Sequence, residues 1–501
     1  MRNDMGGRAR EIALAITSWP SVTGTDDEAV FAGKLADFLG GFNFDRVWTE
    51  AIPGDPAGRS NVFALKRGKT ASAIVLTGHF DVVPIEDYGA LKPLAFAAEK
   101  LLPELIARLK RSGENPLALA DLESGDFLPG RGLLDMKAGL AAGLAAMESY
   151  RGDGNLLFIG VSDEEDRSAG ARAAVPHIGK IAEKHGLAID LIVNLDAISD
   201  QGDGAAGRVV AFGSIGKQLL TAFIVGKEAH ACYPRDGVNA AYLAAELLTE
   251  FELAPELAEA SGDEIAAPPT ALAAKDLKQG YNVTTPAQAW VYWNTLQHRR
   301  TAQEVFDISL MLARRSMTRA AQKVGRNIPV MDYAELASRI PKADVDAKAR
   351  ELAALSQLDL PERAKLLTAH VWEKAGLSGP AVIMGFGSIP YPAVTLADQA
   401  LEDTIMAAAK AHGLSSVRYF PGISDMSFLG EAAGDLAAAS GNTPMWGTGF
   451  VMPGTAGYPC INIGPWGRDY HHWLERLHAP YAFETLPRVL LAVIEAVFKR
   501  G

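Results

Sequence analysis

A histidine and an aspartate stand two residues apart where an apolar run of the sequence ends. The segment TGHFDVVP (77–84) follows the apolar residues 73–76, and we expect a buried strand over 73–79. Because residues i and i+2 of a strand face the same side, His79 and Asp81 can stand together at its end. The pair suits a metal-bound imidazole whose second nitrogen is held by a carboxylate. A histidine that is only hydrogen-bonded at a strand end would give the same pattern.

More acids and histidines follow other apolar runs in the same way. They come after strands expected at 155–161, 189–195 and 458–464, and at the start of an Ala- and Gly-rich helix expected over 135–150. These residues are Glu164, Glu165, Asp196, His471, His472 and Asp135. In an open parallel sheet the carboxyl ends of the strands form the crevice where ligands bind. Since acids gathered at one edge would repel one another, we expect cations to hold them together.

The types of these side chains indicate which cations. Two histidines with three or four carboxylates, and no cysteine nearby, suit Zn²⁺, and Co²⁺ or Mn²⁺ would also accept them. The set exceeds what one tetrahedral ion needs, so we expect a pair of ions about 3.5–4 Å apart that share one carboxylate. A spare glutamate would act as general base on a water whose pKa the metal lowers to about 7. Glu164 and Glu165 could divide the tasks of base and ligand.

Periodicity divides the chain into three parts. Residues 1–208 alternate apolar runs with helical patterns, which is typical of a mostly parallel sheet covered by helices. Residues 209–333 form a separate small α+β pattern, and the α/β pattern resumes over 334–501. We therefore expect an α/β domain into which a second domain is inserted.

The expected elements of the later parts and of one further insertion are as follows. The α+β part has strand-like alternation over 208–225 and 281–296 and helical spacing over 239–252 and 301–323. The last part has helical patterns near 334–356, 396–413 and 484–499. Residues 90–125 are an insertion, helical at 96–111 and loop-like afterwards.

Charge and composition exclude several classes of protein. The formal net charge is −12 with no basic stripe, so nucleic acid is not an expected partner. Only Cys232 and Cys460 occur, and the start of the chain is too charged for a signal peptide. No apolar run approaches the roughly 20 residues that span a bilayer. We expect a cytoplasmic protein with no membrane contact.

Taken together, the motifs resemble a known enzyme family. The segments are WPSVTGTDDE (19–28), GRSNVFALKRG (58–68), TGHFDVVP (77–84), GRGLLDMKAG (130–139), SDEED (162–166), GKEAHACYPRDGVNAA (226–241) and HHWLERL (471–477). In this order they are similar to the dinuclear zinc metallopeptidase family of aminoacylase, carboxypeptidase G, acetylornithine deacetylase and succinyl-diaminopimelate desuccinylase. The resemblance implies a phosphorylase/hydrolase-like catalytic domain (1–208 and 334–501) and a ferredoxin-like lid and dimerisation domain (209–333).

The resemblance also implies a ligand set for two zinc ions per chain. Asp135 matches the bridging carboxylate, and the peptide bond that follows it is cis in the family. His79 and Asp196 match the ligands of one zinc, and Glu165 and His471 match those of the other.

Three further residues match family residues around the metals. Asp81 matches the acid that orients the first histidine, and Glu164 matches the general base. His230 matches a lid histidine that reaches the partner subunit's site in a homodimer and stabilises the oxyanion. We prefer His471 to His472 as the ligand because Glu475 lies four residues beyond it, the commoner family spacing.

Two departures bear on the substrate. The lid arginine that commonly follows an Asn-Val-x-Pro motif is missing, since no arginine follows Asn282 until Arg299 and Arg300. The segment between Asp81 and Asp135 is long and could cover the site. These features resemble the arginine-utilisation branch of the family, so whether a substrate carboxylate is bound stays open.

The expected function is hydrolysis of an amide bond in an N-acyl amino acid or a short peptide, in arginine or ornithine catabolism. The family mechanism implies attack by a hydroxide that bridges the zincs, with Glu164 as base. One alternative is a catalytically silent metal-binding member that acts as a regulator or binding partner. A serine hydrolase fits poorly because Ser388 does not stand in a G-x-S-x-G elbow.

Overall fold

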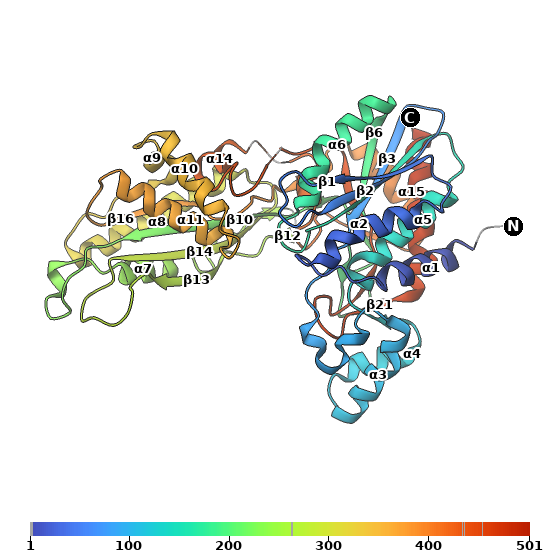
Figure 1. Ribbon diagram of the computed structural model, residues 1–501, viewed down its shortest axis with the longest axis horizontal. Helices are drawn as coiled ribbons and strands as arrows, with labels where there is room; N and C mark the ends of the chain where they lie inside the picture. Colours follow the sequence, from blue (N-terminus) through green and yellow to red (C-terminus); the bar gives the residue numbers. More distant parts are fainter. Residues whose placement is uncertain (1–3, 262–263, 433, 435, 453, 501) are drawn as a thin grey trace. The chain divides into compact units, whose positions relative to one another are not determined.

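The chain folds into two compact units (Figure 1). The computed structural model describes residues 4–261, 264–432, 434, 436–452 and 454–500. The first unit comprises Met1–Ser214, Thr395–Glu431 and Thr455–Gly501, and the second comprises Ile215–Val394 and Ala432–Gly454. The α/β class with an interrupting second unit is thus confirmed.

The first unit is built on a large, mainly parallel sheet. Its strands are β1 (Arg46–Ala51), β2 (Ser60–Lys66), β3 (Ser72–His79), β5 (Asn155–Val161), β6 (Ala188–Asn194), β8 (Val209–Ala211), β18 (Ser415–Val417) and β19 (Cys460–Asn462). They form an eight-stranded sheet in the order β1-β2-β5-β3-β6-β19-β8-β18. The central strands β5, β3, β6 and β19 are parallel neighbours, so their carboxyl ends meet at one edge.

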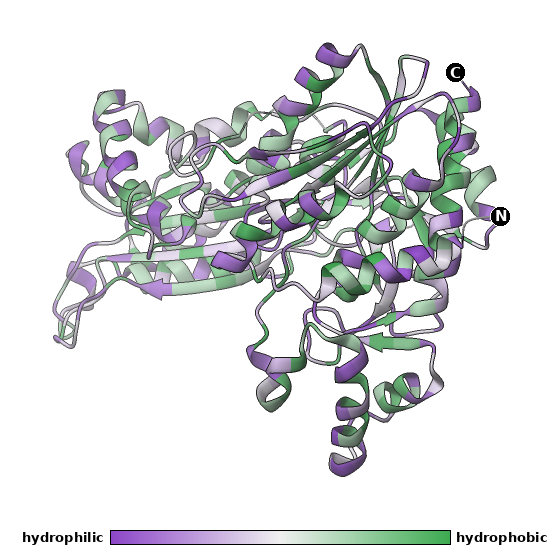
Figure 2. Cartoon of the chain, turned by 45° about the vertical axis from the view of Figure 1, so that its right-hand side comes forward, coloured by the Kyte–Doolittle hydropathy of each residue, from purple (hydrophilic) through white to green (hydrophobic). Residues whose placement is uncertain are grey.

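Helices with apolar faces surround this sheet. They are α1 (Met5–Thr17), α2 (Asp26–Leu39), α5 (Ala138–Ser149), α6 (Ala169–His185), α12 (Gln399–Lys410), α13 (Met426–Leu429) and α15 (Leu486–Arg500). Figure 2 shows hydrophobic residues along the strands of the large sheet and hydrophilic residues on the outer turns of the helices. None of the helices in the described part of the chain has both the length and the apolar character to cross a bilayer.

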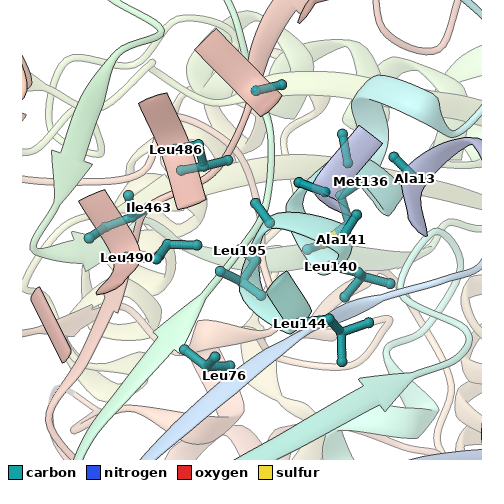
Figure 3. Packing of buried hydrophobic residues seen from close by; sticks show 14 of the residues in the cluster. Ala13, Leu76, Met136, Leu140, Ala141, Leu144, Leu195, Ile463, Leu486 and Leu490 are labelled. Atoms are coloured by element: carbon teal, nitrogen blue, oxygen red, sulfur yellow. The ribbon is translucent and has the colours of Figure 1, made fainter. Parts of the chain in front are cut away.

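Helix α5 lies in the middle of the core. Figure 3 shows Leu140 and Leu144 of this helix packed near Leu76 and Leu195 of the sheet region. The close approach depends on glycine, because a Cβ added at Gly139 would lie 2.1 Å from the carbonyl oxygen of Leu195. This contact explains why an Ala- and Gly-rich helix follows Asp135.

The insertion after Asp81 is more helical than we expected. It contains a 3₁₀ segment (Glu86–Leu94), α3 (Ala98–Ser112), α4 (Pro116–Ser124) and β4 (Phe127–Pro129). The expectation of a loop after residue 111 is wrong for 116–124. A proline opens α4, as is favourable at a first helical position, and Ala118 and Leu122 bury its inner face.

Strand β4 anchors this insertion to the C-terminal part of the first unit. It belongs to a four-stranded sheet with β7 (Ile198–Ser199), β20 (Trp466–Arg468) and β21 (Arg476–His478), in the order β4-β21-β20-β7. Strands β20 and β21 are an antiparallel hairpin, and their connection contains His471 and His472. The insertion therefore packs beside a loop that contains two candidate metal ligands.

The second unit has a mainly antiparallel sheet with helices. Its strands are β10 (Gly216–Val225), β13 (Thr270–Asp276), β14 (Gln288–Gln297), β15 (Val330–Asp332) and β16 (Ala381–Phe386), in the order β13-β14-β10-β16-β15. Its helices are α7 (Ala240–Phe251), α8 (Ala302–Val324), α9 (Tyr333–Ala337), α10 (Lys342–Ala353), α11 (Leu360–Lys374) and α14 (Ala437–Asn442). Helices α7 and α8 share one apolar core with the sheet.

The limits of the second unit differ from the expected 209–333. The unit begins at residue 215, extends to 394 and takes in 432–454. The reason is strand pairing, since β16 pairs with β10 and thereby draws α9, α10 and α11 into the unit. The single helix expected near 334–356 is instead two helices, α9 and α10, with Pro341 between them.

Candidate metal centre

Side chains from three separate segments meet at the carboxyl edge of the large sheet. His79 ends β3, Glu165 follows β5, and Asp135 precedes α5. One ligand atom from each of these residues lies within 4.8 Å of the others. Because β3 and β5 are parallel neighbours, their carboxyl ends lie side by side. The residues at and just after these ends are therefore close together.

Asp135 stands between two imidazoles. Its Oδ1 lies 3.1 Å from Nε2 of His79, and its Oδ2 lies 3.1 Å from Nε2 of His471. Burial alone would raise the pKa of this carboxyl, but hydrogen bonding to His471 and His79 lowers it. The peptide bond between Asp135 and Met136 is cis, as the family resemblance implied. A carboxylate that faces one imidazole with each oxygen is placed to bridge two cations.

His79 is fully buried and faces acids. Its Nε2 lies 3.7 Å from Asp196 and 3.9 Å from Glu164. Burial would lower the pKa of this imidazole, but Glu164, Asp135 and Asp196 raise it well above its usual value. His79 and Asp196 thus meet on one side of Asp135.

Asp81 contacts His79 differently from our expectation. Nδ1 of His79 lies 3.0 Å from the backbone carbonyl oxygen of Asp81, whereas the carboxylate is 3.7 Å away. That carboxylate instead accepts the backbone N–H groups of Glu164 and Glu165, at 3.1 and 3.2 Å, and the hydroxyl of Thr23 at 2.8 Å. Asp81 therefore orients the histidine through its main chain and fixes the turn of the two glutamates through its side chain.

His471 lies on the other side of Asp135. Its Nε2 is 3.2 Å from Glu165 as well as 3.1 Å from Asp135, and its side chain is 45% exposed. The neighbouring His472 has a different environment, because its Nδ1 accepts the backbone N–H of Leu474. The geometry therefore brings His471, and not His472, to the acids.

The surroundings of Glu164, Glu165 and Asp196 disfavour their charged forms. Burial raises the pKa of Glu164 well above its usual value and also raises the pKa of Glu165 and Asp196. Imidazole nitrogens and carboxylate oxygens are the donors that Zn²⁺ accepts in proteins. The residues therefore fit a pair of divalent cations.

Sequence reasoning did not single out Asp425, a further acid beside the cluster. Its side chain is almost completely buried, and burial raises the pKa of its carboxyl to about 7. It is close enough to His79, Asp81 and Asp196 for their charges to act on it. Asp425 stands in the segment GISD (422–425), where nothing in the sequence distinguishes it from a turn residue.

An arginine holds the turn that precedes Glu164. Arg59 forms ion pairs with Asp163, with Glu28 at 3.3 Å and with Asp55 at 2.7 Å. Glu28 also accepts the backbone N–H of Asp163 at 2.9 Å. Asp163 has a φ of 65°, which is costly for a residue with a side chain, and these contacts hold it there.

His230 belongs to the second unit, whereas the clustered acids and histidines belong to the first. It is exposed, its backbone bridges to Thr284, and its Nδ1 accepts the N–H of Cys232 at 3.1 Å. The structure thus gathers His79, Asp81, Asp135, Glu164, Glu165, Asp196 and His471 in the first unit. The oxyanion role of His230 stays a prediction.

Known proteins resemble this chain along its whole length. The sequence profile of the family described as "Peptidase family M20/M25/M40" matches residues 75–458. The chain is 32% identical over 533 residues to the uncharacterized protein YqjN of Bacillus subtilis (strain 168), covering 98% of this chain and 96% of YqjN. It is 27% identical over 534 residues to Protein RocB of the same strain, covering 96% of this chain and 94% of RocB.

A solved structure shares the fold. The YXEP protein of Bacillus subtilis, described as a dinuclear metal-binding peptidase of the M20 family, superposes with a TM-score of 0.53. It is 13% identical, and the match covers 98% of each chain. At this identity the likeness shows the fold alone.

Proposed function

We infer the function of this chain from two facts: it belongs to peptidase family M20/M25/M40, and its Asp135 carboxylate lies between the imidazoles of His79 and His471. The chain is therefore a hydrolytic metalloenzyme. We propose that it hydrolyses an amide bond in N-acyl amino acids or short peptides. The position of Asp135 is the observation that supports this function most directly.

Two zinc ions, or Co²⁺ or Mn²⁺ in their place, would be held by the gathered side chains. His79 and Asp196 would hold one ion, Glu165 and His471 the other, and Asp135 would be shared. When bound, such a pair polarises the carbonyl oxygen of the amide and lowers the pKa of water. The donor set of two imidazoles and three carboxylates supports this assignment.

Glu164 is the proposed general base. Its carboxyl is buried and its pKa is raised, so it can take a proton from the attacking water and give it to the leaving nitrogen. It lies 3.9 Å from Nε2 of His79, and its own backbone N–H is held by Asp81. These contacts support a place for Glu164 beside the proposed ligands.

His230 is the proposed oxyanion donor, acting in a homodimer formed through the second unit. Its exposure leaves the imidazole accessible to another copy of the chain. The proposal requires a dimer in solution, which sedimentation can test. Replacing His230 by Ala should lower turnover by about 10²–10³-fold while the metal content is unchanged.

The proposed substrates are basic, namely acylated arginine or ornithine or dipeptides that contain them, in amino-acid catabolism. Full-length similarity to RocB and the resemblance to the arginine-utilisation branch support this choice. Of the two arginines nearest the missing lid position, Arg300 donates from Nη1 to the backbone carbonyl oxygen of Glu256 at 2.7 Å.

A screen of the metal-loaded protein tests the proposal. N-acetylarginine, N-acetylornithine and basic dipeptides should be hydrolysed with release of a free amino acid, and the Glu164→Gln variant should be inactive on the same substrates. Hydrolysis of acylated acidic amino acids alone would refute the substrate class. Absence of hydrolysis of every amide tested, by protein that holds metal, would refute the reaction.

A further inference from the structure

The loop that contains His471 is closed by two arginines that face each other. Arg468 ends β20 and Arg476 begins β21, and the two are directly opposite in the antiparallel hairpin. Both are buried, Arg468 at 8% and Arg476 at 1% exposure. Like charges directly opposite destabilise a strand pair. The base of the loop therefore needs an anion.

Asp121 of the insertion supplies that anion. Its carboxylate accepts from Nη1 of Arg468 at 2.6 Å and from Nε of Arg476 at 2.8 Å. Asp121 lies on α4, far from the hairpin in sequence, and only 9% of its surface is exposed. One carboxylate from the insertion thus joins the two strands that bound the loop.

Arg476 also contacts the loop itself, so it connects Asp121 to that loop. Its Nη1 donates to the carboxylate of Asp469, and the carbonyl oxygen of Asp469 accepts the N–H of His472 at 3.2 Å. Asp469 and His471 have φ values of 55° and 62°, a left-handed conformation that side chains other than glycine adopt at a cost. Such a backbone persists where surrounding contacts enforce it, and the ion pairs of Arg476 do so here.

A second set of hydrogen bonds links the same loop to the segment just before Asp135. The buried Glu475 accepts from Nη1 of Arg131 at 2.7 Å and from the N–H of Gly132 at 2.9 Å. Arg131 also donates to Asp87 of the insertion at 3.1 Å. The insertion therefore contacts the segments of both ligands, through Asp121 on the His471 side and through Asp87 on the Asp135 side.

We propose that residues 86–129 brace the His471 loop, and that Asp121 is a positioning residue for metal binding by His471. The length of the insertion suggested that it covers the site. The proposed bracing of the His471 loop is a different role. The inference rests on the proposed function, because it needs His471 to be a metal ligand. It adds that an element outside the ligand set governs how tightly the second ion is held.

The test compares two variants of α4 in the full-length protein. Asp121→Asn removes the charge between the arginines, and its amide N–H₂ would face their N–H groups. Glu123→Gln is the control, because Glu123 lies on the same helix and pairs with Lys110 at 2.5 Å. Metal affinity is measured by competition with a chromophoric chelator, and kcat and KM are measured at several zinc concentrations.

We expect Asp121→Asn to keep one ion tightly and to bind the second about 10–100-fold more weakly, the range seen when groups that orient ligands are removed. Its kcat should fall at low zinc and recover at high zinc, with KM unchanged. Glu123→Gln should match the wild type. If Asp121→Asn does not fold, Asp469→Asn, at a more exposed position of the same chain of contacts, should show a smaller weakening of the second ion.

If Asp121→Asn bound both ions with unchanged affinity, the proposed bracing role of residues 86–129 would be wrong, even if the variant melted at a lower temperature. The brace would equally be wrong if Asp121→Asn did not fold and Asp469→Asn bound both ions normally. A wild-type protein that takes up no metal would instead overturn the proposed function, and the brace with it. The wild-type titration therefore separates the two failures.

Discussion

Nε2 of His471 lies 3.1 Å from Oδ2 of Asp135, although 336 residues separate the two in the chain. The other oxygen of the same carboxylate faces His79. Asp135 thus joins the N-terminal and C-terminal segments of the first unit at one edge of the sheet. These contacts make its carboxylate the common member of both proposed ion sites.

Replacing Glu164 by Gln should leave the metal content unchanged and lower kcat by about 10²–10⁴-fold, because the amide cannot accept a proton. Elemental analysis and steady-state kinetics on the same preparation measure both quantities. A variant that retained its metal and more than a tenth of its turnover would exclude Glu164 as the base.

Replacing Asp135 by Ala should remove the acceptor between the two imidazoles and release metal from both positions. Dialysed protein should then contain less than one equivalent of zinc per chain by elemental analysis. Two equivalents in the Asp135→Ala variant would contradict a bridging role. Circular dichroism spectra that match the wild type would show that the loss is local.

His471 and His472 offer a matched pair of substitutions in one loop. His471→Ala should lose one equivalent of metal and most activity, because its Nε2 faces Asp135 and Glu165. His472→Ala should keep both ions, since the ring of His472 accepts a backbone N–H. Isothermal titration with zinc reports the number of sites. The opposite pattern would reassign the ligand.

Two glycines in helices test the packing of α5 on the sheet. A Cβ at Gly139 would lie 2.1 Å from the carbonyl oxygen of Leu195, whereas one at Gly179 in α6 would meet nothing within 4 Å. Gly139→Ala should destabilise the protein by about 1–3 kcal/mol through overpacking. Gly179→Ala should stabilise it by about 0.5–1 kcal/mol. Thermal unfolding followed by circular dichroism should rank the wild type between them, and equal melting temperatures would refute the close contact.

The two cysteines should differ in reactivity. Cys232 is exposed, while Cys460 is buried in β19 and burial raises the pKa of its thiol. A colorimetric thiol reagent should titrate one equivalent in the native protein and two after denaturation. Cys232→Ser should abolish the native reaction. Rapid reaction of both thiols in the native state would show that β19 is not where the structure has it.

Local patterns were sufficient for the central strands and for the gathering of the acids. The runs at 73–79, 155–161 and 189–195 are mostly apolar, as buried parallel strands are, so β3, β5 and β6 were predicted within one residue. Parallel pairing then brings their carboxyl ends together. That rule, joined to the family resemblance, was enough to propose the positions of His79, Glu165 and Asp196.

Contacts between distant segments could not be predicted. The second unit ends later than expected because β16 pairs with β10, a contact that no local pattern encodes. Helix α4 is short, and its hydrophobic face becomes clear only when it is packed. The carboxylate of Asp81 accepts hydrogen bonds from the backbone N–H groups of Glu164 and Glu165. This contact depends on how the segments after β3 and β5 lie together, which the sequence does not show. The ion pairs of Asp121 with Arg468 and Arg476 are equally invisible in the sequence.

Anomalous X-ray diffraction from zinc-loaded crystals, recorded on both sides of the zinc absorption edge, tests the central claim most directly. We predict two anomalous peaks on either side of the Asp135 carboxylate, one within bonding distance of His79 and Asp196 and the other of Glu165 and His471. Zinc bound elsewhere, or a single peak that does not touch Asp135, would contradict the metal centre from which the proposed function follows.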